Sequence, residues 1–365
     1  MKYKIPWAKP YFYGNEARYV NDALKSTWIS GGRYVDEFEM RFRKTIGARH
    51  GLSVSNGTTA LHLVLLGLGL RKGDEVIVPG YTFVAPVNMV IVNGAKPVYA
   101  DIDPYTWCVS PEEISKKITR RTRAVIAVHI YGNCCDMKGI KTAAGRQGVS
   151  VIEDTAEACL SKEGDRFAGT IGDAGCFSFQ ATKTITMGEG GFVACRSKDL
   201  ADRLKIIRDH GMDRNKRYWH HVVGFNFRLT NMQAAMGVAQ LENAGYIVAA
   251  HDKVVGMYKE RLEGLNGVTF QRITGSVSPV IWTVAVKLEP RAFRVSRDGV
   301  IKKLAAKGIE TRPGFYSFRA MPAYRAGRLK VSEDVGSKLI CLPTYSSISE
   351  RDVDMVCGAL KSLMR

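Results

Sequence analysis

At 365 residues, the chain is long enough for about two globular domains, and its 45% hydrophobic and 24% charged residues exclude an intrinsically disordered protein. No apolar run reaches the roughly 18 residues of a membrane span, and the first residues lack the hydrophobic region of a signal peptide, so we expect a cytoplasmic protein that does not enter the membrane. The formal net charge of +18 indicates an anionic partner: nucleic acid, a membrane surface or a small phosphorylated ligand.

The basic residues are scattered along the chain and are not interleaved with aromatic residues, so nucleic-acid binding is a minor hypothesis. A surface that attracts a phosphorylated ligand agrees better with this distribution. The eight cysteines show neither CxxC nor Cys/His ligand spacing. We therefore expect buried, reduced thiols and no metal site.

The first part of the chain predicts two amphipathic helices, at residues 14–27 and 34–46. Between them, residues 28–32 form either a plain connection or a mobile substrate loop. A short strand from Leu52 then leads into an apolar helix, with Gly57 and Thr58 at the helix N-terminus. Backbone N–H groups, a threonine hydroxyl and the helix dipole can bind a phosphate there, although capping alone is the commoner role of such residues.

Strands and helices alternate over the next eighty residues, which predicts a largely parallel sheet covered by helices. We expect strands at residues 75–79, 97–101, 124–129 and 150–154, and helices at 83–92, 111–118 and 137–147. Ligand sites in such sheets lie at the carboxyl ends of the strands. Asp154 stands at one of these ends.

Lys183 lies in a short loop between two predicted buried strands, 176–179 and 192–195. Three glycines in 188–191 allow the chain to turn sharply before the second strand. A lysine in this position is either a solvated loop residue or a catalytic amine, and position alone favours the solvated residue.

The rest of the chain predicts a second, smaller α/β unit. We expect helices at 200–208, 232–262, 297–307 and 352–363, strands at 268–270 and 281–286, and a basic loop at 211–221. The long helix is the natural hinge, so we predict a large domain over residues 1–245 and a small C-terminal domain over 246–365.

Taken together, the helix start at Gly57 and Thr58, the acid Asp154 and the amine Lys183 are what pyridoxal 5′-phosphate requires. Its phosphate needs helix-terminal N–H groups, its ring nitrogen needs a carboxylate, and its aldehyde needs a lysine for a Schiff base. Phe83 follows a strand end and could lie on the cofactor ring, although a role in the core is about as well supported by the sequence.

Several segments resemble the sugar aminotransferase family DegT/DnrJ/EryC1/StrS, and the resemblance runs from Pro10 to near the C-terminus. It implies pyridoxal phosphate fold type I, an α/β fold with a mostly parallel sheet in the large domain and a smaller C-terminal α/β domain. Each segment is a weak signal alone, but together they are specific. The segments are 53–58, 73–79, 128–132, 153–154, 177–179, 188–191 and 224–228.

The resemblance implies roles for four residues around the cofactor ring. Lys183 matches the lysine that bonds to the cofactor and moves protons, and Asp154 matches the partner of the ring nitrogen. Glu157 matches the residue on the ring hydroxyl side, and Phe83 matches the stacking aromatic.

Further matches concern the cofactor phosphate. Gly57, Thr58 and Ser178 match the phosphate cradle. Asn226 matches a residue that reaches the phosphate from a neighbouring subunit, and Arg228 is a second candidate for this role. The resemblance therefore implies a homodimer with shared active sites.

Within the family, segments 103–108 and 211–219 are most similar to members that transfer an amino group from L-glutamate to C4 of GDP-4-keto-6-deoxy-D-mannose. Three residues depart from the family pattern: Arg319 stands where a histidine is common, Thr184 where asparagine is frequent, and Gln180 is a smaller deviation. If that histidine lies near the sugar, Arg319 leaves open which nucleotide sugar is bound and which carbon is aminated.

Three alternatives stay open at this point. The acceptor could be another keto-deoxysugar, aminated at C3 or C4 and carried by dTDP or UDP. A dehydrase of the same fold is a second alternative, against which Lys183 argues because such relatives carry histidine there. The third is a basic regulatory or nucleic-acid-binding protein that kept the fold without the reaction.

Overall fold

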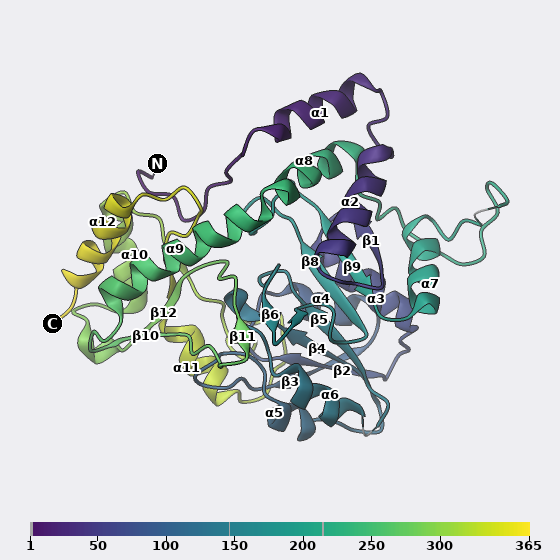
Figure 1. Ribbon diagram of the computed structural model, residues 1–365. Helices are drawn as coiled ribbons and strands as arrows, with labels where there is room; N and C mark the ends of the chain where they lie inside the picture. The colour runs from purple at the N-terminus through teal and green to yellow at the C-terminus, as the bar shows by residue number, and fades with distance from the viewer. Residues whose placement is uncertain (1–2, 146, 214) are drawn as a thin grey trace.

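The computed structural model describes residues 3–145, 147–213 and 215–365, and its centre is a seven-stranded sheet (Figure 1). The strand order is β1-β9-β8-β5-β4-β2-β3. All neighbours from β8 to β3 are parallel, and only β9 runs against its two neighbours. The strands are β1 (His50–Val54), β2 (Glu75–Pro79), β3 (Lys96–Ala100), β4 (Thr122–Val128), β5 (Ser150–Asp154), β8 (Ala174–Ser178) and β9 (Gly191–Cys195). The mostly parallel α/β sheet predicted from the alternating pattern is thus confirmed.

Helices cover both faces of this sheet, which explains why β2, β8 and β9 are buried along their whole length. The N-terminal helices are α1 (Asn15–Lys25), α2 (Arg33–Thr45), α3 (Gly57–Leu68), α4 (Ala85–Val92), α5 (Pro111–Ser115), α6 (Met137–Gly145) and α7 (Lys198–Arg208). Residue 146, in the helix predicted over 137–147, lies outside the described residues. Along β8, Cys176 joins the core that contains α3, whereas Phe177 joins the core that contains α2. Successive side chains therefore point to opposite helical layers.

An aromatic cluster fixes α2 against the sheet. Phe38 and Phe42, which are four residues apart and therefore share one face of α2, are both fully buried. The Phe42 ring meets Phe177, Phe179 and Phe192 edge-on, with ring centroids 5.0–5.1 Å apart. Such edge-to-face contacts add to the stabilisation from burial. They anchor the strands β8 and β9, which flank residues 179–190, the loop that carries Lys183 and is called the lysine loop.

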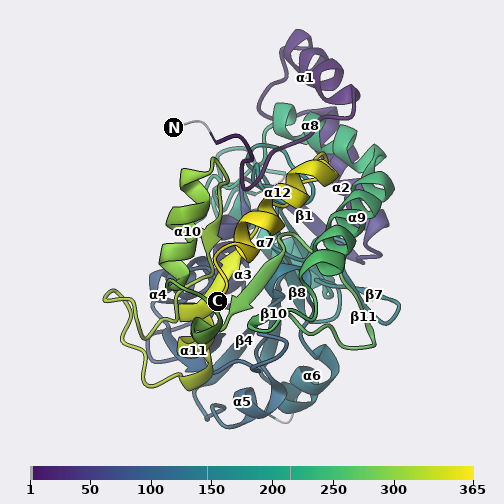
Figure 2. The ribbon, with the colours of Figure 1, turned by 90° about the vertical axis from the view of Figure 1, so that its left-hand side faces the viewer.

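The C-terminal part has its own sheet and its own core (Figure 2). Its strands, in the order β10-β12-β14-β13, are antiparallel: β10 (Val268–Phe270), β12 (Ala285–Leu288), β14 (Leu339–Cys341) and β13 (Arg312–Pro313). Its helices are α9 (Ala244–Leu262), α10 (Arg297–Ala306), α11 (Lys330–Lys338) and α12 (Glu350–Lys361). Ile5, near the N-terminus, packs into this second core. The division at residue 245 remains a prediction.

Two predicted elements differ from the structure. The helix predicted over 232–262 is two helices, α8 (Asn231–Glu242) and α9, because Asn243 has φ −110° and ψ 14° and leaves the helical conformation. The strand predicted over 281–286 begins only at Ala285. The Trp282 backbone N–H instead donates to the Tyr131 carbonyl, so this segment runs toward the large sheet.

Small elements complete the chain. A three-stranded sheet that the sequence did not predict consists of β6 (Lys162–Glu163), β7 (Arg166–Phe167) and β11 (Val277–Ser278), and single 3-10 turns lie at Ile130–Gly132 and Pro290–Ala292. No helix among the described residues combines the length and apolar character needed to cross a membrane.

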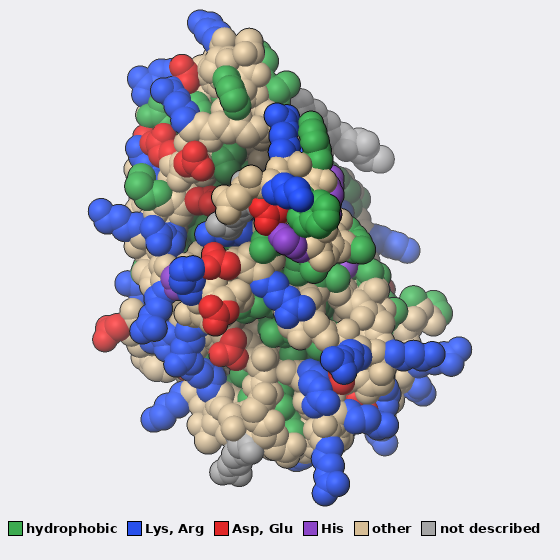
Figure 3. All heavy atoms as spheres, turned by 90° about the vertical axis from the view of Figure 1, so that its right-hand side faces the viewer, with side chains coloured by type: hydrophobic (Ala, Val, Ile, Leu, Met, Phe, Trp, Pro, Cys, Tyr) green, Lys and Arg blue, Asp and Glu red, His purple; other side chains and the backbone are tan. Residues whose placement is uncertain are grey.

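All eight cysteines are buried free thiols. Figure 3 shows Lys and Arg side chains spread over one face of the molecule, with acidic side chains among them.

Candidate active site

The predicted site residues of the large sheet meet in a cavity of about 870 Å³ at the carboxyl ends of its strands. Val128, Asp154 and Ser178 end strands β4, β5 and β8, and all three line the cavity. Residues 312–316 of the C-terminal part, together with Trp7 and Trp282, also line the cavity. This is where a parallel sheet is expected to bind its ligand.

One end of the cavity is built from the start of α3. Asn56 caps the helix by accepting from the Thr59 N–H at 2.9 Å, and the Thr59 hydroxyl accepts from the Asn56 N–H at 3.0 Å. The cap leaves the N–H groups of Gly57 and Thr58 without a partner among the described residues, and both residues line the cavity. These N–H groups and the helix dipole make this end suitable for an anion.

Gly57 lies so close to Ser178 that any side chain at position 57 would force one of the two residues to move. A Cβ atom at Gly57 would stand 2.7 Å from the Ser178 Cβ, closer than any ordinary contact. The strand end of β8 and the helix start of α3 are therefore in direct contact. The three residues predicted to hold a phosphate, Gly57, Thr58 and Ser178, lie together.

Asp154 is, with Glu157, one of two buried acids that the described residues place on the cavity wall. Its Oδ1 accepts the Ala156 N–H at 3.0 Å, and no hydrogen bond from the described residues reaches its Oδ2. Burial raises the pKa of Asp154, while the Ala156 N–H and the charge of Lys183 act in the opposite direction. A cationic nitrogen next to this carboxyl group would favour its ionised form.

The neighbouring Glu153 points to the other face of the sheet. It accepts from His129 Nε2 at 2.9 Å and from three backbone N–H groups between Gly169 and Gly172. Burial opposes ionisation of Glu153, but these hydrogen bonds and His129 outweigh it and lower the pKa. Because adjacent strand residues alternate, only Asp154 of this pair reaches the cavity.

Lys183 reaches the cavity from the loop between β8 and β9. Its Nζ lies 3.9 Å from Glu157 Oε1 and 3.6 Å from the centre of the Trp282 ring. Burial lowers the pKa of Lys183, whereas Glu157 and Asp154 raise it. The amine therefore gives up its proton more readily than a solvated lysine does.

Gln180 folds the lysine loop, a role that sequence reasoning missed. Its Oε1 accepts from the Thr182 N–H at 2.9 Å and from the Thr182 hydroxyl at 2.7 Å. Its carbonyl accepts from the Lys183 N–H at 2.8 Å. Although Gln180 departs from the family pattern, its hydrogen bonds still give this loop a defined turn.

Glu157 is held between Lys183 and the backbone. Its Oε2 accepts the Tyr131 N–H at 2.9 Å. Burial raises the pKa of Glu157 to about 7, against the opposing charge of Lys183 and the Tyr131 hydrogen bond. This carboxyl group therefore changes charge close to neutral pH.

The raised pKa of Glu157 predicts a pH dependence of stability in the cofactor-free protein. A carboxyl group with a folded pKa of about 7 and an ordinary pKa of 4.5 stabilises the fold fully below pH 4.5, and this contribution is lost as the pH rises through 7. The loss is on the order of 3 kcal/mol, at about 1.4 kcal/mol per pH unit. Urea unfolding between pH 4.5 and 7.5 should show this decline in wild type and a flatter profile in Glu157→Gln. Parallel profiles would contradict it.

Phe83 lies on the cavity wall and is 54% exposed. Its ring is 6.0 Å from Phe315, which stacks on Tyr131 at 5.6 Å with an angle of 9° between the rings. Tyr131 and Phe315 were not singled out from the sequence. The open face of Phe83 leaves room for a planar ligand, and its predicted stacking role remains a prediction.

Asn226 and Arg228 do not reach the cavity of their own chain. Asn226 is exposed, and its Oδ1 accepts from Arg228 Nε at 3.1 Å. Arg228 Nη1 also pairs with Asp209 at 2.6 Å. The prediction that these residues serve a neighbouring subunit thus remains a prediction.

Arg319 also lies outside the cavity wall. Its Nη1 donates to the Ala326 carbonyl at 3.3 Å, and its side chain is exposed. Arg312 of the same segment does line the cavity, where it pairs with Glu310 at 2.6 Å. Arg312 is therefore the arginine of this region that can meet a ligand.

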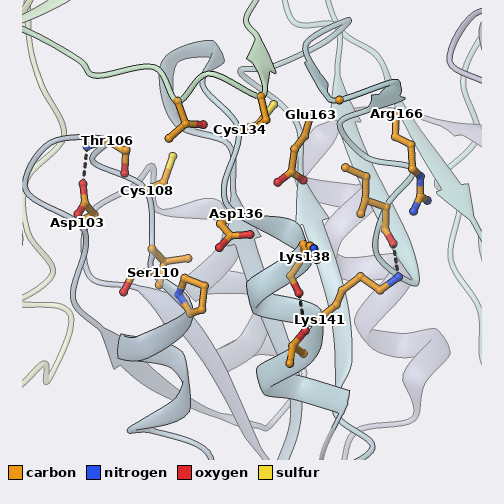
Figure 4. A pocket seen from close by; sticks show the side chains of 17 residues that line it. Asp103, Thr106, Cys108, Ser110, Cys134, Asp136, Lys138, Lys141, Glu163 and Arg166 are labelled. Carbon is orange, nitrogen blue, oxygen red and sulfur yellow. Dashed lines mark hydrogen bonds between the residues drawn. The ribbon is translucent and has the colours of Figure 1, made fainter.

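A second hollow, of about 980 Å³, contains none of the predicted site residues (Figure 4). Acidic, basic and thiol side chains line it together, among them Asp103, Cys108, Asp136, Lys141, Glu163 and Arg166. Most of these polar groups are engaged within the chain. Lys141 donates to the Ile171 carbonyl at 3.0 Å, and Arg166 donates to the Thr170 carbonyl. Asp103 accepts the Thr106 N–H at 2.6 Å, and Asp136 accepts the Gly139 N–H at 2.8 Å. The residues predicted for catalysis therefore line the cavity with Lys183 and not this second hollow.

Comparisons with known proteins agree over nearly the whole length. The sequence model of the DegT/DnrJ/EryC1/StrS aminotransferase family matches residues 11–361. The chain is 42% identical to a GDP-perosamine synthase of Caulobacter vibrioides over 366 residues, covering 99% of this chain and 98% of that protein. It is 41% identical to a GDP-perosamine synthase of Escherichia coli O157:H7, with the same shares.

Solved structures show the same fold. The aminotransferase TlmJ from Streptoalloteichus hindustanus superposes with a TM-score of 0.93 at 27% identity, covering 98% of both chains. The sugar aminotransferase CalS13 from Micromonospora echinospora gives a TM-score of 0.91 at 26% identity, covering 98% of this chain and 99% of that one. The predicted fold class is thus confirmed.

Proposed function

Because this chain belongs to the DegT/DnrJ/EryC1/StrS aminotransferase family, we propose that it uses pyridoxal 5′-phosphate to transfer the amino group of L-glutamate to C4 of GDP-4-keto-6-deoxy-D-mannose, which gives GDP-perosamine. The similarity to two GDP-perosamine synthases over nearly the full length supports this acceptor. The single observation that carries the reaction is the buried lysine Lys183, which shares one cavity with Asp154 and the start of α3.

The cavity fits the cofactor at three points. At the start of α3, where Gly57 has no side chain and lies against Ser178, the backbone N–H groups of Gly57 and Thr58 have no partner among the described residues. A phosphate can approach and accept from these N–H groups. Asp154 has one carboxylate oxygen without a partner among the described residues, which suits a protonated ring nitrogen. Lys183 is a buried amine with a lowered pKa, which suits a carbonyl carbon.

When bound, pyridoxal phosphate supplies an electron sink that allows an amino group to be exchanged for a carbonyl oxygen. The chain supplies binding and proton transfer. Gly57, Thr58 and Ser178 would hold the phosphate, and the carboxylate of Asp154 would pair with the protonated ring nitrogen. Lys183 Nζ, which lies 3.9 Å from Glu157 Oε1, would accept and return the proton that moves during the transfer.

A homodimer with shared sites is part of the proposal. Apolar side chains on the segment that precedes Asn226 are strongly exposed, including Tyr218 at 75% and Val223 at 88%. This segment projects from the body of the molecule, at the right of Figure 1. Residue 214, within the segment 211–219, lies outside the described residues. Exposed apolar groups of this kind favour burial against another subunit, which supports a role for Asn226 in the neighbouring site.

One incubation tests the substrate. The purified protein, loaded with pyridoxal phosphate, is mixed with L-glutamate and with GDP-, UDP- and dTDP-linked 4-keto-6-deoxyhexoses, and each product is identified by mass and NMR. We expect an amine at C4 of the GDP-linked mannose derivative and at least tenfold slower turnover of the other sugars. Faster turnover of a UDP or dTDP sugar, or amination at C3, would replace the proposed acceptor. Loss of water without a gain of nitrogen would indicate a dehydrase.

A further inference from the structure

Trp282 contacts the lysine loop at two successive residues. Its ring lies over Lys183, with 3.6 Å between the ring centre and Nζ. Its indole N–H donates to the Thr182 carbonyl at 2.6 Å. Trp282 belongs to the segment before β12, about a hundred residues further along the chain.

The Trp282 side chain is itself fixed on other sides. The Trp7 ring meets it edge-on, with centroids 5.5 Å apart and an angle of 87°. The Trp282 backbone N–H donates to the Tyr131 carbonyl at 3.1 Å, and only 7% of the residue is exposed. The indole therefore presents a fixed face to the amine.

An aromatic face affects the amine differently from a carboxylate. It attracts the ammonium form through the ring quadrupole but cannot take its proton. Four charged side chains share the cavity wall with Lys183. Two are the carboxylates Asp154, at the end of β5, and Glu157, shortly after it. The others are Glu189, between Gly188 and Gly190, and Arg312 on β13. Of these, Glu157 and Asp154 raise the pKa of Lys183, whereas burial lowers it.

We propose that Trp282 is the positioning residue for the amine of Lys183: its ring face holds Nζ in the cavity whenever this amine is not bonded to the cofactor, and its N–H fixes the loop. This inference rests on the proposed function in one respect, because it takes Lys183 as the catalytic amine. It assigns to the C-terminal part of the chain a direct contact with the reacting lysine.

The test uses cofactor-free full-length protein without substrates. The pKa of Lys183 is measured from the pH dependence of its acetylation by acetic anhydride, followed by mass spectrometry of the Lys183 peptide. We expect Trp282→Leu to lower this pKa by about half a pH unit or more, because the attraction of the ring is lost. Trp282→Phe should retain most of the pKa. Phe167→Leu is the matched control, because Phe167 lies under a different lysine, Lys162, at 4.5 Å.

The N–H contact has its own readout. Trp282→Phe removes the donor to Thr182 and should increase amide hydrogen exchange of residues 180–184 at least threefold. If Trp282→Leu does not fold, Trp282→Met takes its place in the pKa measurement. If the pKa of Lys183 is unchanged in Trp282→Leu and the amide exchange of residues 180–184 is unchanged in Trp282→Phe, Trp282 has no positioning role and contributes only to packing. Because no substrate is present, this outcome is distinct from failure of the proposed sugar reaction.

Discussion

Replacing Lys183 by alanine should lower the rate of amino-group transfer from L-glutamate by about 100- to 10,000-fold, the usual contribution of a positioned acid–base group. Lys183 is the one lysine on the cavity wall among the described residues. Arg312, the other basic side chain there, carries a guanidinium group and offers no amine that could replace Lys183. The measurement is the rate of 2-oxoglutarate formation by cofactor-loaded protein.

A control variant and a chemical rescue show whether this loss of rate is specific to the amine of Lys183. Lys138→Ala removes an exposed lysine at the second hollow and should change the rate less than twofold. Ethylamine added to Lys183→Ala should restore part of the rate, because the substitution leaves a space next to Glu157 that a small amine can enter. Equal melting temperatures would show that the fold is retained. A variant that keeps more than a tenth of the wild-type rate would remove Lys183 from the reaction.

The sequence predicted the large sheet and the residues at its edge because both depend on local patterns. A strand that ends at Asp154 and a helix that starts at Gly57 can each be recognised within about ten residues. Parallel topology then brings such ends to one edge of the sheet. The structure gathers Gly57, Thr58 and Asp154 around one cavity for this reason. Lys183 and Ser178 line the same cavity, but the local pattern did not assign Ser178, which only the family resemblance indicated, and did not by itself favour a catalytic Lys183.

The other wall of the cavity could not be predicted in this way. Trp7, Trp282 and Arg312 come from segments that are distant in sequence, and nothing in their own neighbourhoods indicates a shared cavity. Trp282 was read as part of a strand because the residues around it are apolar and β-branched. Its hydrogen bond to Thr182 and its contact with Lys183 decide its position instead.

The break at Asn243 shows the same limit. Asn243 and Gly245 are poor helix formers, but the other residues next to the junction are compatible with one continuous helix. The Asn243 side chain donates to the Ala239 carbonyl at 3.3 Å, and its backbone leaves the helical conformation. A side chain that bonds to its own backbone competes with the helix in a way that the pattern of apolar residues does not reveal.

Gly57→Ala should weaken binding of pyridoxal phosphate by at least about tenfold and lower the free energy of unfolding by about 1–3 kcal/mol. The new Cβ would lie 2.7 Å from the Ser178 Cβ, so either α3 or the end of β8 must move. This movement displaces the N–H groups that receive the phosphate. Equilibrium titration with pyridoxal phosphate and with pyridoxal, which lacks the phosphate, measures the effect, and we expect pyridoxal binding to change much less.

A matched pair of variants separates the phosphate site from general damage. Gly256→Ala, in the interior of α9, adds a Cβ that meets nothing within 4 Å and should stabilise the protein by about 0.5–1 kcal/mol without affecting the cofactor. Ser178→Gly, combined with Gly57→Ala, removes the opposing Cβ and should recover the lost stability but not the full affinity, because the Ser178 hydroxyl is gone. Equal weakening of pyridoxal and pyridoxal phosphate by Gly57→Ala would mean that the phosphate binds elsewhere. Loss of the phosphate-specific part alone would assign the anion to the start of α3, where Gly57 is the one residue that lets helix and strand meet.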